Sequence, residues 1–146
     1  MFEEIERLEF EADVIIAGFA FGFPYIFVVS GRTGAIIAEE HFAAVGTGAD
    51  IAEPNMFQRK HSAECKLGET VYHVYESKRL GQIAVGVGES TYIDILRPTK
   101  AGFTRETAQQ ITQEGLEYLR QKYDTFGPKP IQAKDVRIAK GHFSNF

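Results

Sequence analysis

Histidine and cysteine are the residues of this chain that could bind a metal ion, and it has four histidines and one cysteine. They are His41, His61, His73, His142 and Cys65. No set of them has the helical or knuckle spacing of a metal site, and His61 and Cys65 are a lone i, i+4 pair without further ligands. The spacing therefore predicts no metal site and no cofactor, with histidines that are solvated or singly hydrogen-bonded.

Two side chains could act as nucleophiles or assist one. Cys65 precedes Lys66, which would favour the thiolate, but no histidine and acid accompany it in the sequence. We therefore expect no cysteine enzyme. Thr47 lies between Gly46 and Gly48, where two glycines permit a tight bend and a close approach of the backbone. The simplest interpretation of this turn is that it needs only small residues.

The elements that would position these side chains belong to a chain of 146 residues, 44% of them hydrophobic and 25% charged. This length suits one domain and is too short for two of ordinary size. The formal net charge of −4 gives no general attraction to phosphate, so we expect no nucleic-acid partner. A single cysteine excludes a disulfide scaffold and fits a reducing, cytoplasmic location.

Residues 14–31 carry no charged side chain, and a run of that length requires a membrane span to be considered. Val14–Ala17 and Tyr25–Val29 are β-branched and aromatic, and Pro24 between them would break a helix. The run therefore predicts two buried strands of a hairpin and no membrane partner. The acidic residues ahead of it also argue against a secretory signal.

The whole pattern predicts one α+β domain over residues 1–127, with antiparallel sheets covered by helices, and a basic tail over residues 128–146. Further strands are expected over residues 35–38, 41–45, 90–96 and 135–139. Helices are expected over residues 1–9, 50–56, 69–80 and 104–123, the last capped by Thr104. The apolar stripe of the third helix is Val71, Val74, Tyr75 and Leu80, which leaves Glu76 on the solvent side. The stripe of the fourth is Ala108, Ile111, Leu116 and Leu119.

Several segments also follow one another in a familiar order. They are Val14–Gly18, Pro24–Val29, Phe42–Ala49 with its Gly-Thr-Gly turn, the helix over 69–78, and the glycine-led strand Gly86–Leu96. This order resembles the proteasome-type N-terminal-nucleophile hydrolases, and the resemblance covers roughly residues 10–97. It implies a four-layer sandwich of two antiparallel sheets between helices, in subunits that assemble into rings.

The resemblance also bears on catalysis. In that family an N-terminal threonine attacks the substrate, with its own α-amine as the base. The resemblance places this threonine on strands before the matching region, so we expect this chain to have no active site of its own. Thr47 stands where the family has a serine that supports the amine, which implies a supporting role for its hydroxyl. Glu89 and Ser90 come slightly later than the acid and serine that the family places after its long helix.

Three functions remain open at this point. The first, which we favour, is a non-catalytic proteasome-like domain that assembles with itself or with other proteasome-like subunits. The second is the C-terminal part of an active threonine peptidase or amidase whose nucleophile lies upstream, which leaves open whether the chain is an enzyme. The third is a small-molecule or peptide-binding α+β domain that adds a peptide strand at the edge near residues 85–96.

Overall fold

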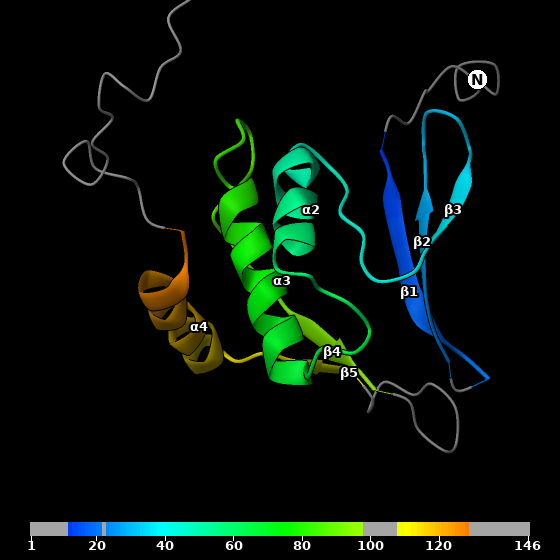
Figure 1. The fold of residues 1–146 in the computed structure, drawn as a ribbon. Coiled ribbons are helices and arrows are strands. Elements are labelled where there is room, and N and C mark those ends of the chain that lie inside the picture. The colour runs from blue at the N-terminus through cyan, green and yellow to red at the C-terminus, as the bar shows by residue number, and fades with distance from the viewer. Residues whose placement is uncertain (1–11, 22, 98–107, 129–146) are drawn as a thin grey trace, which may run out of the picture.

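The structure, a computed structural model, describes residues 12–21, 23–97 and 108–128. In chain order the elements are the strands β1 (Val14–Ala20), β2 (Phe23–Val29) and β3 (Ile36–Glu39), the helices α2 (Ala49–Gln58) and α3 (Leu67–Gly81), the strands β4 (Asp94–Leu96) and β5 (Ala108–Gln110), and the helix α4 (Gln113–Phe126). Two antiparallel sheets form, β1-β2-β3 and β4-β5. Figure 1 shows the three-stranded sheet to one side of the helices. The expected α+β class is confirmed.

The uncharged run folds as the predicted hairpin, but the expectation that its two strands are buried is wrong, because no residue of β1 or β2 is buried. β1 and β2 pair along their full lengths, with Val14 opposite Val29 and Ile16 opposite Phe27. Asp13, the acid just before the run, accepts a hydrogen bond from the backbone N–H of Gly31 at 3.1 Å, which closes the open end of the hairpin. Among the helices of the described residues, none has both the length and the apolar character needed to span a bilayer.

The strand expected over residues 41–45 is wrong. This segment is an irregular connection between β3 and α2, and one of its backbone N–H groups donates to a side chain of α2. The N–H of Ala44 donates to the carboxylate of Glu53 on α2 at 3.1 Å. The ring of Phe42 packs edge-on against Phe57, with centroids 4.8 Å apart. The apolar side chains of the segment therefore serve to attach it to α2 instead of to a sheet.

The helix expected over residues 104–123 is also placed wrongly in part. Ala108–Gln110 is the strand β5, and the helix begins only at Gln113. The N–H of Ile111 donates to the carbonyl of Ile93 at 2.8 Å, so the chain is still paired with β4 at that point. Thr112 is the N-cap, because its hydroxyl accepts from the N–H of Gly115 at 3.2 Å. Thr104 lies outside the described residues.

Apolar packing on both sides of the cap also fixes this helix start. Ile111 before the cap and Leu116 after it both pack against the hydrophobic core, which is the arrangement of a hydrophobic staple.

We expect Thr112→Ala to lower the free energy of unfolding by about 1 kcal/mol, because the Gly115 N–H loses its acceptor. Thr125→Ala in the last turn of α4 is the matched control, and urea unfolding should show little change for it. Equal losses for the two variants would contradict the capping role.

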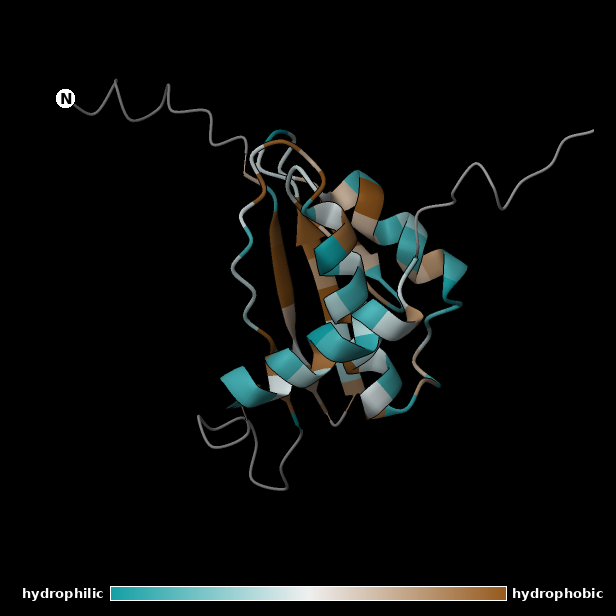
Figure 2. Ribbon diagram, turned by 90° about the vertical axis from the view of Figure 1, so that its left-hand side faces the viewer, coloured by the Kyte–Doolittle hydropathy of each residue, from teal (hydrophilic) through white to brown (hydrophobic). Residues whose placement is uncertain are grey.

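The hydrophobic core lies between the helices and the small sheet. Within the described residues the buried hydrophobic side chains are Met56, Tyr75, Ile93 and Leu119. Tyr75, Ile93 and Leu119 form one cluster, and none of the four lies in β1, β2 or β3. Figure 2 shows the strands of the larger sheet in the colour of hydrophobic residues. The apolar side chains of β1-β2-β3 thus lie outside the buried core.

The other expected elements divide into two groups. The helices over residues 50–56 and 69–80 are confirmed as α2 and α3, with one or two further residues at each end, and Pro54 lies inside α2. The strand over residues 90–96 is shorter than expected and comprises only Asp94–Leu96. The helix over residues 1–9, the strand over residues 135–139 and nearly all of the basic tail lie outside the described residues.

Candidate functional site

Thr47 lies in the turn before α2, as its glycine neighbours predict. Gly46 has a φ of +89°, a conformation that favours glycine, and its carbonyl accepts from the N–H of Ala49 at 3.0 Å. Gly48 is the N-cap of α2 and lies against Gly81 at the end of α3. A Cβ atom on Gly48 would come within 2.9 Å of the Gly81 carbonyl oxygen. The second glycine of the turn therefore has a packing role of its own.

A hollow of about 370 Å³ adjoins Thr47 and also includes Lys78 of α3. Burial, with the neighbouring Arg79, lowers the pKa of Lys78. The Lys78 ammonium donates to the carbonyl of Gly88 at 2.7 Å, so it holds the loop after α3. Thr47 itself is exposed. The structure thus brings a hydroxyl and an amine to one hollow, while the lysine has a structural bond there.

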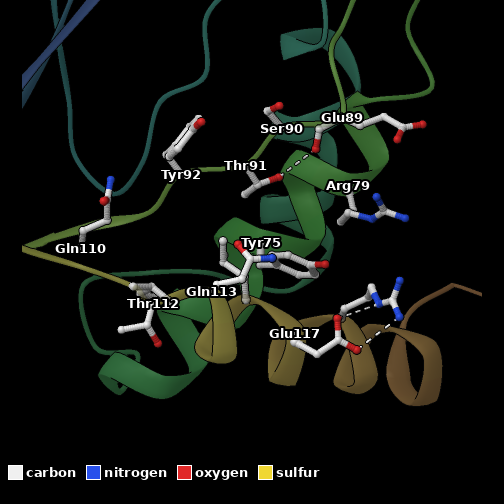
Figure 3. A pocket seen from close by; sticks show the side chains of 13 residues that line it. Tyr75, Arg79, Glu89, Ser90, Thr91, Tyr92, Gln110, Thr112, Gln113 and Glu117 are labelled. Carbon is white, nitrogen blue, oxygen red and sulfur yellow. Dashed lines mark hydrogen bonds and ion pairs between the residues drawn. The ribbon is translucent and has the colours of Figure 1, made fainter.

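A second cavity, of about 620 Å³, lies between α3, the segment Glu89–Tyr92 and the start of α4. Figure 3 shows Tyr75 and Arg79 on α3 and Glu117 on α4 around it. Glu117 pairs with Arg120 at 3.2 Å, and Arg79 donates to Gln82 at 2.9 Å. The Arg79 Nε is buried without a hydrogen-bond partner in the part of the chain that the structure describes.

Glu89 and Ser90 both line this second cavity, although the resemblance placed their counterparts nearer the end of the long helix. The Glu89 carbonyl accepts from Thr91 and from Gln82, so backbone contacts organise this segment. Thr47 is not among the residues around the cavity. Thr47, Glu89 and Ser90, which the resemblance singled out, therefore do not form one site.

A buried ion pair joins α2 to α3. Glu76, whose side chain is 0% exposed, accepts from Arg59 through both of its carboxylate oxygens, with Nε to Oε2 at 2.6 Å. Asn55 and the hydroxyl of Tyr72 donate to the same carboxylate at 3.2 Å. The expected solvent-facing position of Glu76 is therefore wrong, because α2 supplies partners at this point of the α3 surface.

The ionisation of this network follows from its contacts. Burial alone would raise the pKa of Glu76, but the hydrogen bonds from Arg59, Asn55 and Tyr72 outweigh it and lower that pKa. The Glu76 hydrogen bond raises the pKa of Arg59. Burial, together with the Glu76 charge, raises the pKa of Tyr72 to about 12. Glu76 is thus held as a carboxylate by paired donors and is unsuited to acid–base chemistry near neutral pH.

The histidine and cysteine residues of the α2–α3 connection meet a third residue. His61, Cys65 and His73 each offer one ligand atom, and these atoms lie within 4.8 Å of one another. The Nδ1 atoms of His61 and His73 are 3.2 Å apart. Burial lowers the pKa of His61, with further lowering by His73 and His41. The sequence spacing did not indicate His73, because seven residues, which include the start of α3, separate it from Cys65.

The sheet β1-β2-β3 has an apolar face that is open to solvent. Paired residues of adjacent strands share a face, and every second residue along a strand returns to it. The open face carries Val14, Ile16, Phe23, Tyr25 and Ile36, all exposed. Near its centre is a hollow of about 380 Å³ bordered by Ile16, Tyr25 and Phe27.

No protein-family model, curated protein or solved structure matches the chain. Neither the hollow beside Thr47 nor the cavity beside Arg79 pairs a nucleophile with an oriented base within the described residues. An exposed apolar face of several large side chains is, by contrast, typical of a surface that binds another protein.

Proposed function

We propose that this chain is an assembly domain that associates with a second copy of itself through the open face of β1-β2-β3. The observation that carries the proposal is the exposure of this face: its large apolar side chains reach solvent, while the buried hydrophobic cluster lies elsewhere. Burial of such surface is favourable by about 25 cal/mol for each Å². The resemblance to proteasome-type subunits, which work as assemblies, supports the same role.

A second copy suits this face because the face carries no ionisable charge. β1 and β2 contain no acidic or basic residue, so a two-fold contact brings no like charges together. The paired rings of Tyr25 and Phe27 stack 6.2 Å apart and give the face a stiff aromatic centre. The two copies therefore bury matching apolar surfaces without leaving a charge unpaired.

The face also has a projecting aromatic side chain beside its hollow. Phe21, in the turn after β1, is 99% exposed and stands at the rim of the hollow that Ile16 and Tyr25 border. In an isologous contact each copy offers both features, so the Phe21 ring of one copy can fill the hollow of the other. Aromatic residues in pockets are common anchors of protein interfaces.

The test uses two isoleucines of nearly equal exposure. Ile36 on the open face is 70% exposed, and Ile83 in the loop after α3 is 73% exposed. We expect Ile36→Lys to raise the dissociation constant of the dimer at least about tenfold, because the interface must then bury an ammonium group. Sedimentation velocity over a range of protein concentrations measures this shift.

Ile83→Lys is the control, since it adds the same charge at the same exposure away from the face. The proposal requires a wild-type dimer and an Ile83→Lys variant that dissociates like the wild type. A wild-type chain that stays monomeric at all concentrations, or equal weakening by both lysines, overturns it. Circular dichroism of both variants checks that each remains folded.

A further inference from the structure

The ring nitrogens of His61 and His73 have the separation that a tetrahedral metal ion imposes. Zinc lies about 2.0 to 2.1 Å from imidazole nitrogen, so two nitrogens of one tetrahedron are about 3.3 Å apart. The observed Nδ1 to Nδ1 distance is 3.2 Å. One ligand atom from each of His61, Cys65 and His73 lies within 4.8 Å of the other two. The three residues therefore place their donor atoms in one cluster.

The chain reaches this point through a helix end of defined geometry. After α2, the N–H of Lys60 donates to the carbonyl of Phe57 at 2.9 Å and the N–H of His61 donates to Met56 at 3.0 Å. This is the bonding of a Schellman motif, with Lys60 at φ +53° in the left-handed position that glycine usually takes. The motif turns the chain sharply, and His61 is buried against α3.

Cys65 follows in a tight turn, in which its N–H donates to the carbonyl of Ser62 at 3.1 Å. His73 comes from the middle of α3. The Arg59–Glu76 ion pair lies beside these residues on the same two segments, since Arg59 precedes His61 by two positions and Glu76 follows His73 by three. The ion pair therefore holds the end of α2 against α3 where the donors meet.

Aromatic rings adjoin the two histidines. The ring of Phe42 lies 6.0 Å from that of His61, and Tyr72 lies 6.4 Å from His73. Such surroundings reduce the access of water to the ring nitrogens and strengthen bonds to a cation. Two neutral histidines could instead share one hydrogen bond. A hydrogen bond between the two histidines does not involve the Cys65 thiol, whereas a metal site does, so the cysteine distinguishes the two possibilities.

We propose that His61, Cys65 and His73 form a binding site for Zn²⁺, with the fourth position taken by water. Two imidazole nitrogens and one thiolate are borderline and soft donors, which select Zn²⁺ over Mg²⁺ and Ca²⁺. On binding, the Cys65 thiol releases its proton and the ion links the α2–α3 connection to α3. This inference departs from the absence of a metal expected from sequence spacing, and it does not depend on self-association.

The experiment is calorimetric titration of the reduced, chelator-treated protein with Zn²⁺, together with the optical spectrum of its Co²⁺ complex. We expect one ion per chain and a thiolate-to-cobalt charge-transfer band. Cys65→Ser and His73→Gln should each weaken Zn²⁺ binding at least about 100-fold, because each removes a direct ligand. Glu64→Gln, in the same turn as Cys65, should bind Zn²⁺ like the wild type.

The outcomes are decisive in both directions. Absence of stoichiometric Zn²⁺ binding, or a Co²⁺ complex without the thiolate band, overturns the site. Equal affinity in the wild type and the Cys65→Ser variant overturns it as well, because the ion is then held adventitiously. Should one variant fail to fold without metal, the other variant and the wild-type Co²⁺ spectrum still decide the question. Ile36→Lys should bind Zn²⁺ normally, which separates this test from that of the proposed assembly.

Discussion

Arg59→Met is expected to lower the free energy of unfolding by about 3 kcal/mol near neutral pH. The variant keeps the length of the side chain but leaves the carboxylate of Glu76, which is 0% exposed, without its cationic partner. Asn55 and Tyr72 still donate to that carboxylate, which keeps the loss at the lower end of the range for a broken buried pair. The partial exposure of Arg59, 36%, acts in the same direction.

The dependence of this loss on pH identifies its cause. In the wild type the pKa of Glu76 is lowered, so its ionised form stabilises the fold above the ordinary value of 4.5, and this contribution is lost as the pH falls through the folded pKa. Without Arg59, burial dominates and the pKa of Glu76 rises. As the pH falls, protonation of Glu76 removes the cost of a buried, unpaired charge in the variant. The difference in the free energy of unfolding between the two proteins should therefore shrink from pH 7 towards pH 4.

Urea unfolding at several pH values measures both effects. Arg32→Met is the matched control, because Arg32 lies in the exposed turn between β2 and β3. We expect it to change the free energy of unfolding by less than about 0.5 kcal/mol at any pH. An Arg59→Met variant as stable as this control, or a loss independent of pH, would show that the ion pair contributes little to the α2–α3 contact.

Local pattern predicted the parts of the fold whose partners are close in the sequence. The hairpin of β1 and β2 could be predicted because β-branched residues flank Pro24. The turn at Gly46 and Gly48 could be predicted because glycine tolerates the bend at Gly46 and the close contact at Gly48. Glu76 was misplaced because helical periodicity describes one helix and does not include the cation that another helix supplies 17 residues earlier.

The start of α4 shows a second limit of local pattern. Thr104 and Thr112 are both acceptable N-caps by residue type. The pairing of β5 with β4 decides between them, because residues 108–110 are engaged in a sheet and cannot also be helical.

The cluster of His61, Cys65 and His73 was missed for a related reason. Its members come together only after the Schellman motif folds the connection back on α3. The i, i+4 spacing of Asn55 on α2 and Arg59 at its C-cap is a sequence signal that could have indicated a polar partner on α3.

Gly48→Ala is expected to lower the free energy of unfolding by about 2 kcal/mol, a typical loss for overpacking. The added methyl group would lie 2.9 Å from the carbonyl oxygen of Gly81 and 3.2 Å from its carbonyl carbon. That carbonyl cannot easily turn aside, because it accepts from the N–H of Ala84 at 3.1 Å. The methyl group must therefore move the start of α2 away from the end of α3.

Gly68→Ala is the control, because Gly68 lies in the first turn of α3 with nothing within 4 Å of an added Cβ. Alanine there should stabilise the fold by up to about 1 kcal/mol, so the same chemical change has opposite signs at the two sites. Urea unfolding of both variants measures the difference.

Thr47→Ala tests the neighbouring residue in the same experiment. If Gly48→Ala is strongly destabilising and Thr47→Ala is neutral, the Gly-Thr-Gly turn acts through the contact of Gly48 with Gly81. If Gly48→Ala stabilises the fold as Gly68→Ala does, the two helices do not depend on a close backbone contact, and the turn needs another explanation.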